Sequence, residues 1–257
     1  MILQELIQDL EALFPPALAY SWDNVGLLAG SPNQDVKNVL VTLDVNSAVA
    51  QEAAQAGAEL ILSHHPILIG GVKTVRQDTE TGKMLSILFE NKIAVYAAHT
   101  NLDIAPAGIN TYLAALFDLR DPVILADEQP GGAGLGRVGD LKAPVTLAEF
   151  AALCKEKLHT PAVRVSGDPG KKIQRVAVAS GGCGDYIPHA IRHGADVMLT
   201  ADMKYHMAID AVLDGIAVVD AGHYPTEIIA MDIFASVLKQ YALSVHFSKQ
   251  RDIFRFL

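Results

Sequence analysis

Short apolar runs alternate with alanine-rich amphipathic segments along most of the chain. The apolar runs are typical of buried strands, and the segments between them have helical periodicity. The predicted strands are Val39–Leu43, Leu60–Leu62, Ile93–Ala98, Arg175–Ala179, Val197–Leu199, Ile216–Val219 and Leu243–Phe247. The predicted helices are Ser47–Ala56, Lys83–Asn91, Gly108–Phe117, Leu147–Leu158, Pro188–His193, Met207–Asp214 and Thr226–Tyr241. This alternation predicts an α/β fold, with parallel sheets covered by helices on both faces.

The clearest interruption of the pattern is the glycine-rich stretch Asp127–Gly139, whose composition is typical of a loop or a domain junction. We therefore expect a first α/β lobe over residues 1–125 and a second over residues 126–222. Residues 223–257 are expected to return to the first lobe and complete it. The two lobes could be distant structural repeats, although no short-period repeat is visible.

Composition narrows the class of protein. Half of the 257 residues are hydrophobic, which allows a substantial core without disulfides. The net charge of −9 argues against general nucleic-acid binding, but not against nucleotides, because a bound metal can neutralise phosphate locally.

The expected location follows from features that the chain lacks. The acidic, amphipathic segment Met1–Leu13 does not have the basic flank of a signal peptide. No apolar stretch approaches the ~20 residues that span a bilayer. Cys154 and Cys183 are far apart and have no CxxC spacing, so we expect a reduced, cytoplasmic protein without a membrane segment.

Polar residues follow three of the predicted strands, at the carboxyl ends where open α/β sheets bind ligands. The three pairs are His64 and His65, His99 and Asp103, and His223 and Glu227. Imidazole and carboxylate groups at three strand ends suggest one shared metal site.

Each pair also has a simpler interpretation. Adjacent strand residues face opposite sides, so His64 and His65 could point into the core and into solvent. Asp103 could accept backbone N–H groups in a turn, and Glu227 could interact with the dipole of the helix that begins at Pro225. Alternatively, both histidines could reach a common cavity, one to each of two metals, with Ser63 hydrogen bonding to one of them.

Together the pairs supply the ligands of a two-metal site, with ions about 3.5–4 Å apart. The candidate ligands are His64, His65, Asp103, His223 and Glu227. Imidazole and carboxylate donors suit two divalent ions of zinc, iron, manganese, cobalt or nickel, and the sequence leaves the choice open. His99 is expected to orient Asp103 or a bound water, which makes it the candidate catalytic residue for proton transfer.

Other residues carry weaker signals. The loop Ser180–Gly184 could approach an anion, but a tight turn is the preferred interpretation, and no base is assigned to Cys183. The turn at Trp22-Asp23-Asn24 could shape a pocket or simply reverse the chain. Asp202, Lys204 and His206 could line the same cleft or lie on the surface. The candidate phosphate contacts are Lys73, Arg76 and Lys204.

Four segments make the chain resemble the NIF-three-like family of dinuclear-metal proteins, many of which are named GTP cyclohydrolase type 2 homologs. They are SWDNVGLLAG at 21–30, LILSHHP at 60–66, HTNLD at 99–103 and AGHYPTE at 221–227. They occur in the order that the family has, and the length resembles the short members without an inserted domain.

The resemblance implies two similar α/β lobes with the metals in the cleft between them. It implies that His64 and His65 each bind one ion, that Asp103 joins one and His223 the other, and that Glu227 contacts both. It also implies a ring-shaped homohexamer whose sites face an internal cavity.

The leading functional hypothesis is a dinuclear metal-dependent hydrolase with a small-molecule substrate. Water activated by the ions would attack an electrophilic carbon or phosphorus. The resemblance points to opening of the guanine imidazole ring of GTP, or to action on a related nucleotide. The alternatives are a non-catalytic metal-binding or regulatory ring protein, and a metal-dependent phosphoesterase that acts on nucleotides.

Overall fold

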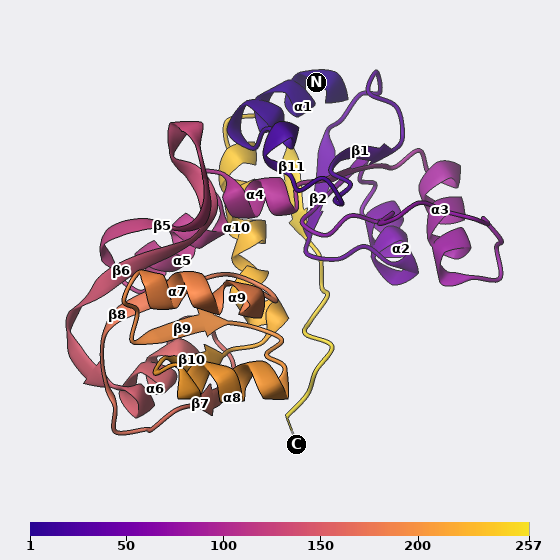
Figure 1. Ribbon diagram of the computed structural model, residues 1–257. Coiled ribbons are helices and arrows are strands. Elements are labelled where there is room, and N and C mark those ends of the chain that lie inside the picture. The colour runs from indigo at the N-terminus through magenta and orange to yellow at the C-terminus, as the bar shows by residue number, and fades with distance from the viewer. Residues whose placement is uncertain (257) are drawn as a thin grey trace. The chain divides into compact units, whose positions relative to one another are not determined.

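Two β-sheets organise the chain, and each sheet belongs to a different unit. The computed structural model describes residues 1–256 (Figure 1). Unit 1 comprises Met1–Ala105 and Ala230–Arg251, and unit 2 comprises Pro106–Ile229 and the segment that begins at Asp252. The division therefore falls at residue 105 rather than near 125, and the return to unit 1 begins at 230 rather than at 223.

The sheet of unit 1 has the order β1-β4-β3-β2-β11. Its strands are β1 (Gly26–Ala29), β2 (Asn38–Thr42), β3 (Leu60–Ser63), β4 (Ala94–Ala97) and β11 (Ser244–Phe247). β11, β2, β3 and β4 are parallel, as predicted, whereas β1 pairs with β4 in the antiparallel direction. The sheet is therefore mixed, with four parallel strands and the antiparallel strand β1 at one edge.

The helices of unit 1 cover both faces of this sheet. They are α1 (Leu3–Leu13), η1 (Pro16–Leu18), α2 (Ser47–Gln55), α3 (Glu80–Glu90), α4 (Thr100–Ile104) and most of α10 (Ile229–Leu238). α2 and α3 lie side by side and pack on Leu40, Ile61 and Val95 (Figure 1). Leu62 and Tyr96, which alternate with those residues, are also buried, so the strands contribute apolar side chains to both faces.

The sheet of unit 2 has the order β5-β6-β8-β9-β10-β7. Its strands are β5 (Arg120–Gln129), β6 (Ala133–Thr146), β7 (Arg164–Ser166), β8 (Lys172–Val178), β9 (Val197–Thr200) and β10 (Ala217–Asp220). β8, β9 and β10 are parallel, and the other pairs are antiparallel. The expectation of wholly parallel sheets is therefore wrong for both units. It holds for β4, β3, β2 and β11 in unit 1 and for β8, β9 and β10 in unit 2.

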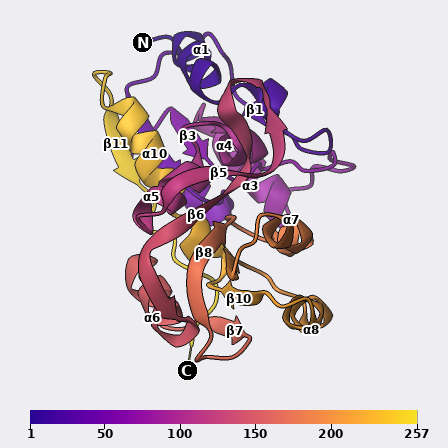
Figure 2. The ribbon, with the colours of Figure 1, turned by 60° about the vertical axis from the view of Figure 1, so that its left-hand side comes forward.

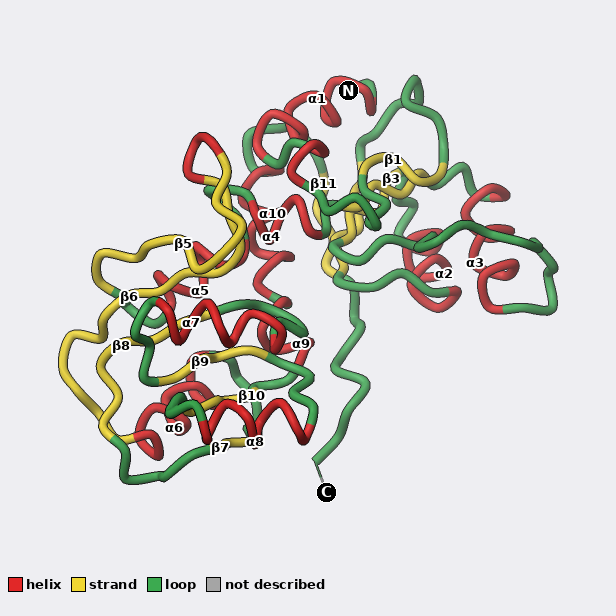
Figure 3. The backbone as a smooth tube through the Cα atoms, viewed as in Figure 1, coloured by secondary structure: helices red, strands yellow, loops and turns green. Residues whose placement is uncertain are grey.

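The expectation of a loop at Asp127–Gly139 is also wrong. β5 and β6 form a long antiparallel hairpin, and the turn η2 (Pro130–Gly132) lies at its tip (Figure 3). Gly134, Gly136 and Gly139 belong to β6. Gly136 has φ +65°, and a Cβ there would lie 2.7 Å from Leu125 Cδ2. The same composition that suggests a domain junction serves close packing inside unit 2.

Helices lie on both faces of the second sheet. They are α5 (Ile109–Leu116), α6 (Leu147–Lys157), η3 (Gly184–Tyr186), α7 (Ile187–Arg192), α8 (Tyr205–Leu213) and α9 (His223–Glu227). Figure 2 shows β8 with α6 on one side and α7 and α8 on the other. Ala177 and Met198 pack in the core that contains residues of α7 and α8. The predicted helices are thus present with small shifts at their ends, except that Thr226–Tyr241 is divided between α9 and α10.

No helix among residues 1–256 is both long enough and apolar enough to cross a membrane.

Glu59 ties the start of β2 to the start of β3. Its Oε2 accepts the backbone N–H groups of Lys37 at 3.0 Å and Asn38 at 2.8 Å. Burial would raise the pKa of this carboxyl, but the hydrogen bonds from Asn38 and Lys37 outweigh it and lower the pKa below 4.5. The ionised form therefore stabilises the folded state.

We predict that Glu59→Gln lowers the free energy of unfolding by about 1 kcal/mol at pH 7, since one charged acceptor is lost. A carboxylate with a depressed folded-state pKa stabilises the fold above the unfolded pKa and loses this effect as pH falls through the folded value. The free energies of unfolding of variant and wild type, measured with urea, should therefore differ at pH 7 and become equal in acid. The exposed Glu90→Gln serves as control, and an equal loss at both pH values would contradict the role of the charge.

Candidate metal centre

Three histidines of unit 1 lie close together beyond the carboxyl ends of β3 and β4. β3 and β4 are adjacent and in register at Ser63 and Ala97, so the residues that follow them leave the sheet together. The imidazole rings of His64, His65 and His99 have centroids 5.0–5.4 Å apart. One potential ligand atom of each lies within 4.8 Å of the others. The simpler interpretation, with His64 and His65 on opposite faces, does not hold in this structure.

Asp103 joins this group through α4. His99 precedes the first turn of α4, and the Asp103 N–H donates to the His99 carbonyl, which places the two residues one turn apart. Asp103 Oδ1 lies 4.0 Å from His64 Nε2. We call His64, His65, His99 and Asp103 the unit 1 cluster.

Every imidazole of the unit 1 cluster has its Nδ1 at hydrogen-bond distance from an acceptor. The pairs are His64 with the Ala98 carbonyl at 2.9 Å, His65 with Asp44 Oδ1 at 2.6 Å, and His99 with Asp23 Oδ1 at 2.9 Å. Carbonyl and carboxylate oxygens only accept hydrogen bonds, so each Nδ1 must be the donor. In the neutral ring, Nε2 then has the lone pair that a metal ion requires.

Asp23 is a strongly perturbed acid in unit 1. Its side chain is fully buried, and its Oδ2 accepts the Thr100 backbone N–H and hydroxyl. Burial would raise the pKa of Asp23, but hydrogen bonds from His99 and Thr100 hold it well below its usual range. The ionised carboxylate fixes the orientation of His99, a more specific role than the turn or pocket-shaping role that the sequence suggests.

Unit 2 holds a second group, the unit 2 cluster of Asp202, His223 and Glu227. His223 Nδ1 lies 2.7 Å from Asp202 Oδ2, and Nε2 lies 2.9 Å from Glu227 Oε2. The hydrogen bond to Glu227 raises the pKa of His223 to about 9, against the effect of burial and with a further contribution from Asp202. A metal ion at Nε2 would replace the proton that this ring holds at neutral pH.

The glycine loop after β8 makes room for the Glu227 carboxylate. Gly181 has φ +64°, and a Cβ there would lie 2.2 Å from Glu227 Oε1. The Gly181 N–H donates to Thr226 Oγ1, and the Cys183 N–H donates to Thr200 Oγ1. These contacts are those of a tight turn, the preferred interpretation of the loop, rather than of an anion site.

The predicted ligands divide between the units: His64, His65 and Asp103 belong to unit 1, and His223 and Glu227 to unit 2. Their imidazole nitrogens and carboxylate oxygens fit borderline divalent metals, so the donor chemistry is compatible with the predicted ions. Each unit by itself contributes an imidazole and a carboxylate to such a site.

Sequence reasoning missed Asp44, the acceptor for His65. The available signal was its position directly after the predicted strand Val39–Leu43, the same criterion that selected the histidines. Asp202, which could equally have been a surface residue, holds His223.

Other expectations differ from the structure in detail. The Ser63 hydroxyl donates to the His65 backbone carbonyl rather than to an imidazole. Arg76 pairs with Asp78, and the side chains of Lys73 and Lys204 are exposed. His206 is exposed and packs edge-on against Tyr205.

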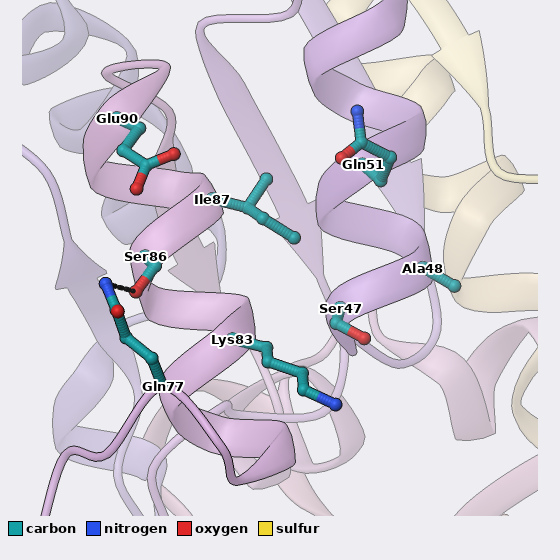
Figure 4. A pocket seen from close by; sticks show the side chains of 8 residues that line it. All are labelled: Ser47, Ala48, Gln51, Gln77, Lys83, Ser86, Ile87 and Glu90. Carbon is teal, nitrogen blue, oxygen red and sulfur yellow. Dashed lines mark hydrogen bonds between the residues drawn. The ribbon is translucent and has the colours of Figure 1, made fainter.

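A groove between α2 and α3 lies apart from these clusters within unit 1 (Figure 4). Its volume is about 510 Å³, and Gln77 donates to Ser86 along one wall. Its lining includes Ser47, Lys83 and Glu90 but none of the candidate ligands. This groove is therefore not the candidate site.

Fold and clusters together define a mixed α/β protein with histidine–carboxylate groups at the ends of its strands. A family model, Duf34/NIF3 (NGG1p interacting factor 3), matches residues 1–253. The chain belongs to this family, as the resemblance predicts.

Relatives of known sequence support the assignment. A Streptomyces coelicolor protein named GTP cyclohydrolase 1 type 2 homolog is 38% identical over 260 aligned residues, which cover 96% of this chain and 91% of that protein. A Methanocaldococcus jannaschii protein of the same name is 35% identical, with 91% and 93% of the two chains covered.

Solved structures share the fold along nearly the whole chain. A Bacillus cereus protein related to NIF3 has a TM-score of 0.92 and 27% identity, with 99% of both chains covered. Reduced HcgD from Methanocaldococcus jannaschii has a TM-score of 0.85 and 33% identity, with 97% of this chain and 98% of that chain covered.

We predict that Gly181→Ala disturbs the unit 2 cluster more than it disturbs the fold. The added methyl group must displace Glu227, and the positive φ adds strain of about 1–2 kcal/mol. Gly194→Ala is the matched control, because Gly194 also has a positive φ (+69°) but its Cβ would meet open space. Isothermal titration should show weaker Zn²⁺ binding for Gly181→Ala only. Equal affinities in the two variants, at similar thermal stability, would contradict the role of Gly181.

Proposed function

We propose that this protein is a dinuclear metal-dependent hydrolase that acts on a nucleotide. The proposed ligands of two divalent ions are the residues that the sequence predicts: His64, His65, Asp103, His223 and Glu227. The observation that carries the proposal is the anchoring of each candidate imidazole through Nδ1. Hydrogen bonds of this kind set the tautomer and orientation of metal-binding histidines, and surface histidines do not require them.

The bound ions would supply a water whose pKa lies near 7 rather than 15.7. His99 is assigned the proton transfer, because its Nδ1 is held by Asp23 and its Nε2 can accept or release a proton. The ionised Asp23 stabilises the imidazolium that forms when His99 takes a proton. Asp103 and Glu227 supply negative charge, and Glu227 is the carboxylate assigned to both ions.

The nucleotide assignment is supported by the name that the relatives carry, GTP cyclohydrolase 1 type 2 homolog. In this version of the reaction, water attacks C8 of guanine and the imidazole ring opens. We extend the proposal to a homohexameric ring in the cytoplasm, supported by the family resemblance and, for the location, by the two cysteines without CxxC spacing.

We predict that Glu227→Gln binds fewer metal ions and loses hydrolysis while it remains folded. His64→Ala and His65→Ala should each lose about one ion per chain, since each imidazole serves a different ion. Elemental analysis of purified, metal-loaded protein measures the content directly. The exposed His206→Ala should retain full occupancy, and full metal content in Glu227→Gln would count against the bridging role.

We predict that His99→Gln retains both ions but turns over substrate about 10²–10⁴-fold more slowly, as expected when general acid–base catalysis is removed. The assay compares release of formate or ring-opened product from GTP with hydrolysis of simple phosphate esters. Turnover of the phosphate esters but not of GTP would indicate that the protein is a phosphoesterase and not a cyclohydrolase. A protein with both ions and no turnover on either substrate would be a metal-binding or regulatory protein.

A further inference from the structure

The C-terminal segment of unit 2 forms one wall of a cavity beside His223. The cavity has a volume of about 370 Å³, within the range of about 300–1,000 Å³ typical of small-molecule sites. Its lining includes His223 and Asp202 of the unit 2 cluster. A ligand in this cavity would therefore lie next to the proposed metal centre.

Two phenyl rings line the cavity and are largely exposed. Phe254 is 72% exposed and Phe256 is 56% exposed, although both are large apolar side chains. The Phe254 N–H donates to Asp252 Oδ1 at 2.9 Å, which holds the turn that carries the rings. Exposed aromatic rings at a cavity wall offer flat faces on which a planar heterocycle can stack.

Two guanidinium groups line the same cavity. Arg164 pairs with the buried carboxylate of Asp220 and donates to the Met203 carbonyl, so it is held in place. Arg255 comes between the two phenylalanines in the sequence, and its side chain is exposed. The lining also includes Asp202, Asp220 and Asp252, so the cavity as a whole is not positively charged, but the two planar guanidinium groups have the geometry that suits phosphate.

We propose that this cavity binds a nucleoside phosphate, with the base against Phe254 and Phe256 and the phosphate near Arg164 and Arg255. This inference rests on the proposed function and adds the position at which its substrate binds. The nucleotide site is formed by the C-terminal segment, β7 and the loop before α9. Stacking provides affinity for any base, and the guanidinium groups distinguish a nucleotide from a nucleoside.

The experiment uses the full-length, zinc-loaded protein and measures binding of GMP, guanosine and inorganic phosphate by isothermal titration calorimetry. Phe254→Ala/Phe256→Ala should weaken GMP binding about tenfold or more and leave the metal content unchanged. Ile253→Ala is the matched control, because Ile253 is 87% exposed and is absent from the lining of the cavity. It should bind GMP as the wild type does.

Arg255→Gln separates the contributions of phosphate and base. It should weaken GMP binding about tenfold and leave guanosine binding unchanged, whereas the exposed Arg251→Gln should alter neither. An unchanged GMP affinity in the double phenylalanine variant would overturn the inference, as would the absence of GMP binding to the wild type.

The experiment distinguishes failure of the proposed nucleotide site from failure of the proposed metal-dependent hydrolase. If zinc is bound and GMP is not, the nucleotide site is wrong and the metal centre stands. If GMP binding depends on Phe254 and Phe256 in a protein that binds no metal, the nucleotide site stands and the hydrolase does not.

Discussion

The candidate site depends on hydrogen bonds that hold imidazole rings through Nδ1. His65 and His223 have aspartate acceptors, Asp44 and Asp202, that come shortly after a strand of the same unit, while His64 uses the carbonyl of Ala98 after β4. A histidine without such an acceptor can take either tautomer, and its ring can turn about its own axis. The acceptors remove both freedoms, so the geometry is prepared before any ion binds.

This arrangement is compatible with stability because the site lies beyond the ends of the strands. The apolar residues of β2, β3 and β4 fill the core of unit 1, and the polar residues follow where the strands end. The cost of collecting ionisable groups is offset locally, as in Asp23, whose hydrogen bonds more than compensate for its burial. The core and the site are therefore built from different residues of the same strands and the turns that follow them.

Much of the fold could be predicted because its central strands are short, continuous apolar runs. Such runs reveal buried parallel strands, and the polar residues that follow them reveal the binding edge. The same criterion would have identified Asp44, but aspartate after a strand is so common in turns that it carries little information alone. Its role becomes visible only when β2 and β3 lie side by side and bring His65 within reach.

The glycine-rich hairpin shows why the domain boundary could not be found in the same way. Glycine favours loops because it tolerates positive φ, but it also permits backbones and side chains to approach more closely than a Cβ allows. Gly136 does both within β6, so its local sequence is ambiguous and only its partner Leu125 decides the outcome. Gly181 poses the same ambiguity at the candidate site, where the absent side chain leaves space for the Glu227 carboxylate. In both places the role of the glycine is decided by a residue on another element, Leu125 on β5 or Glu227 on α9, which the composition around the glycine does not reveal.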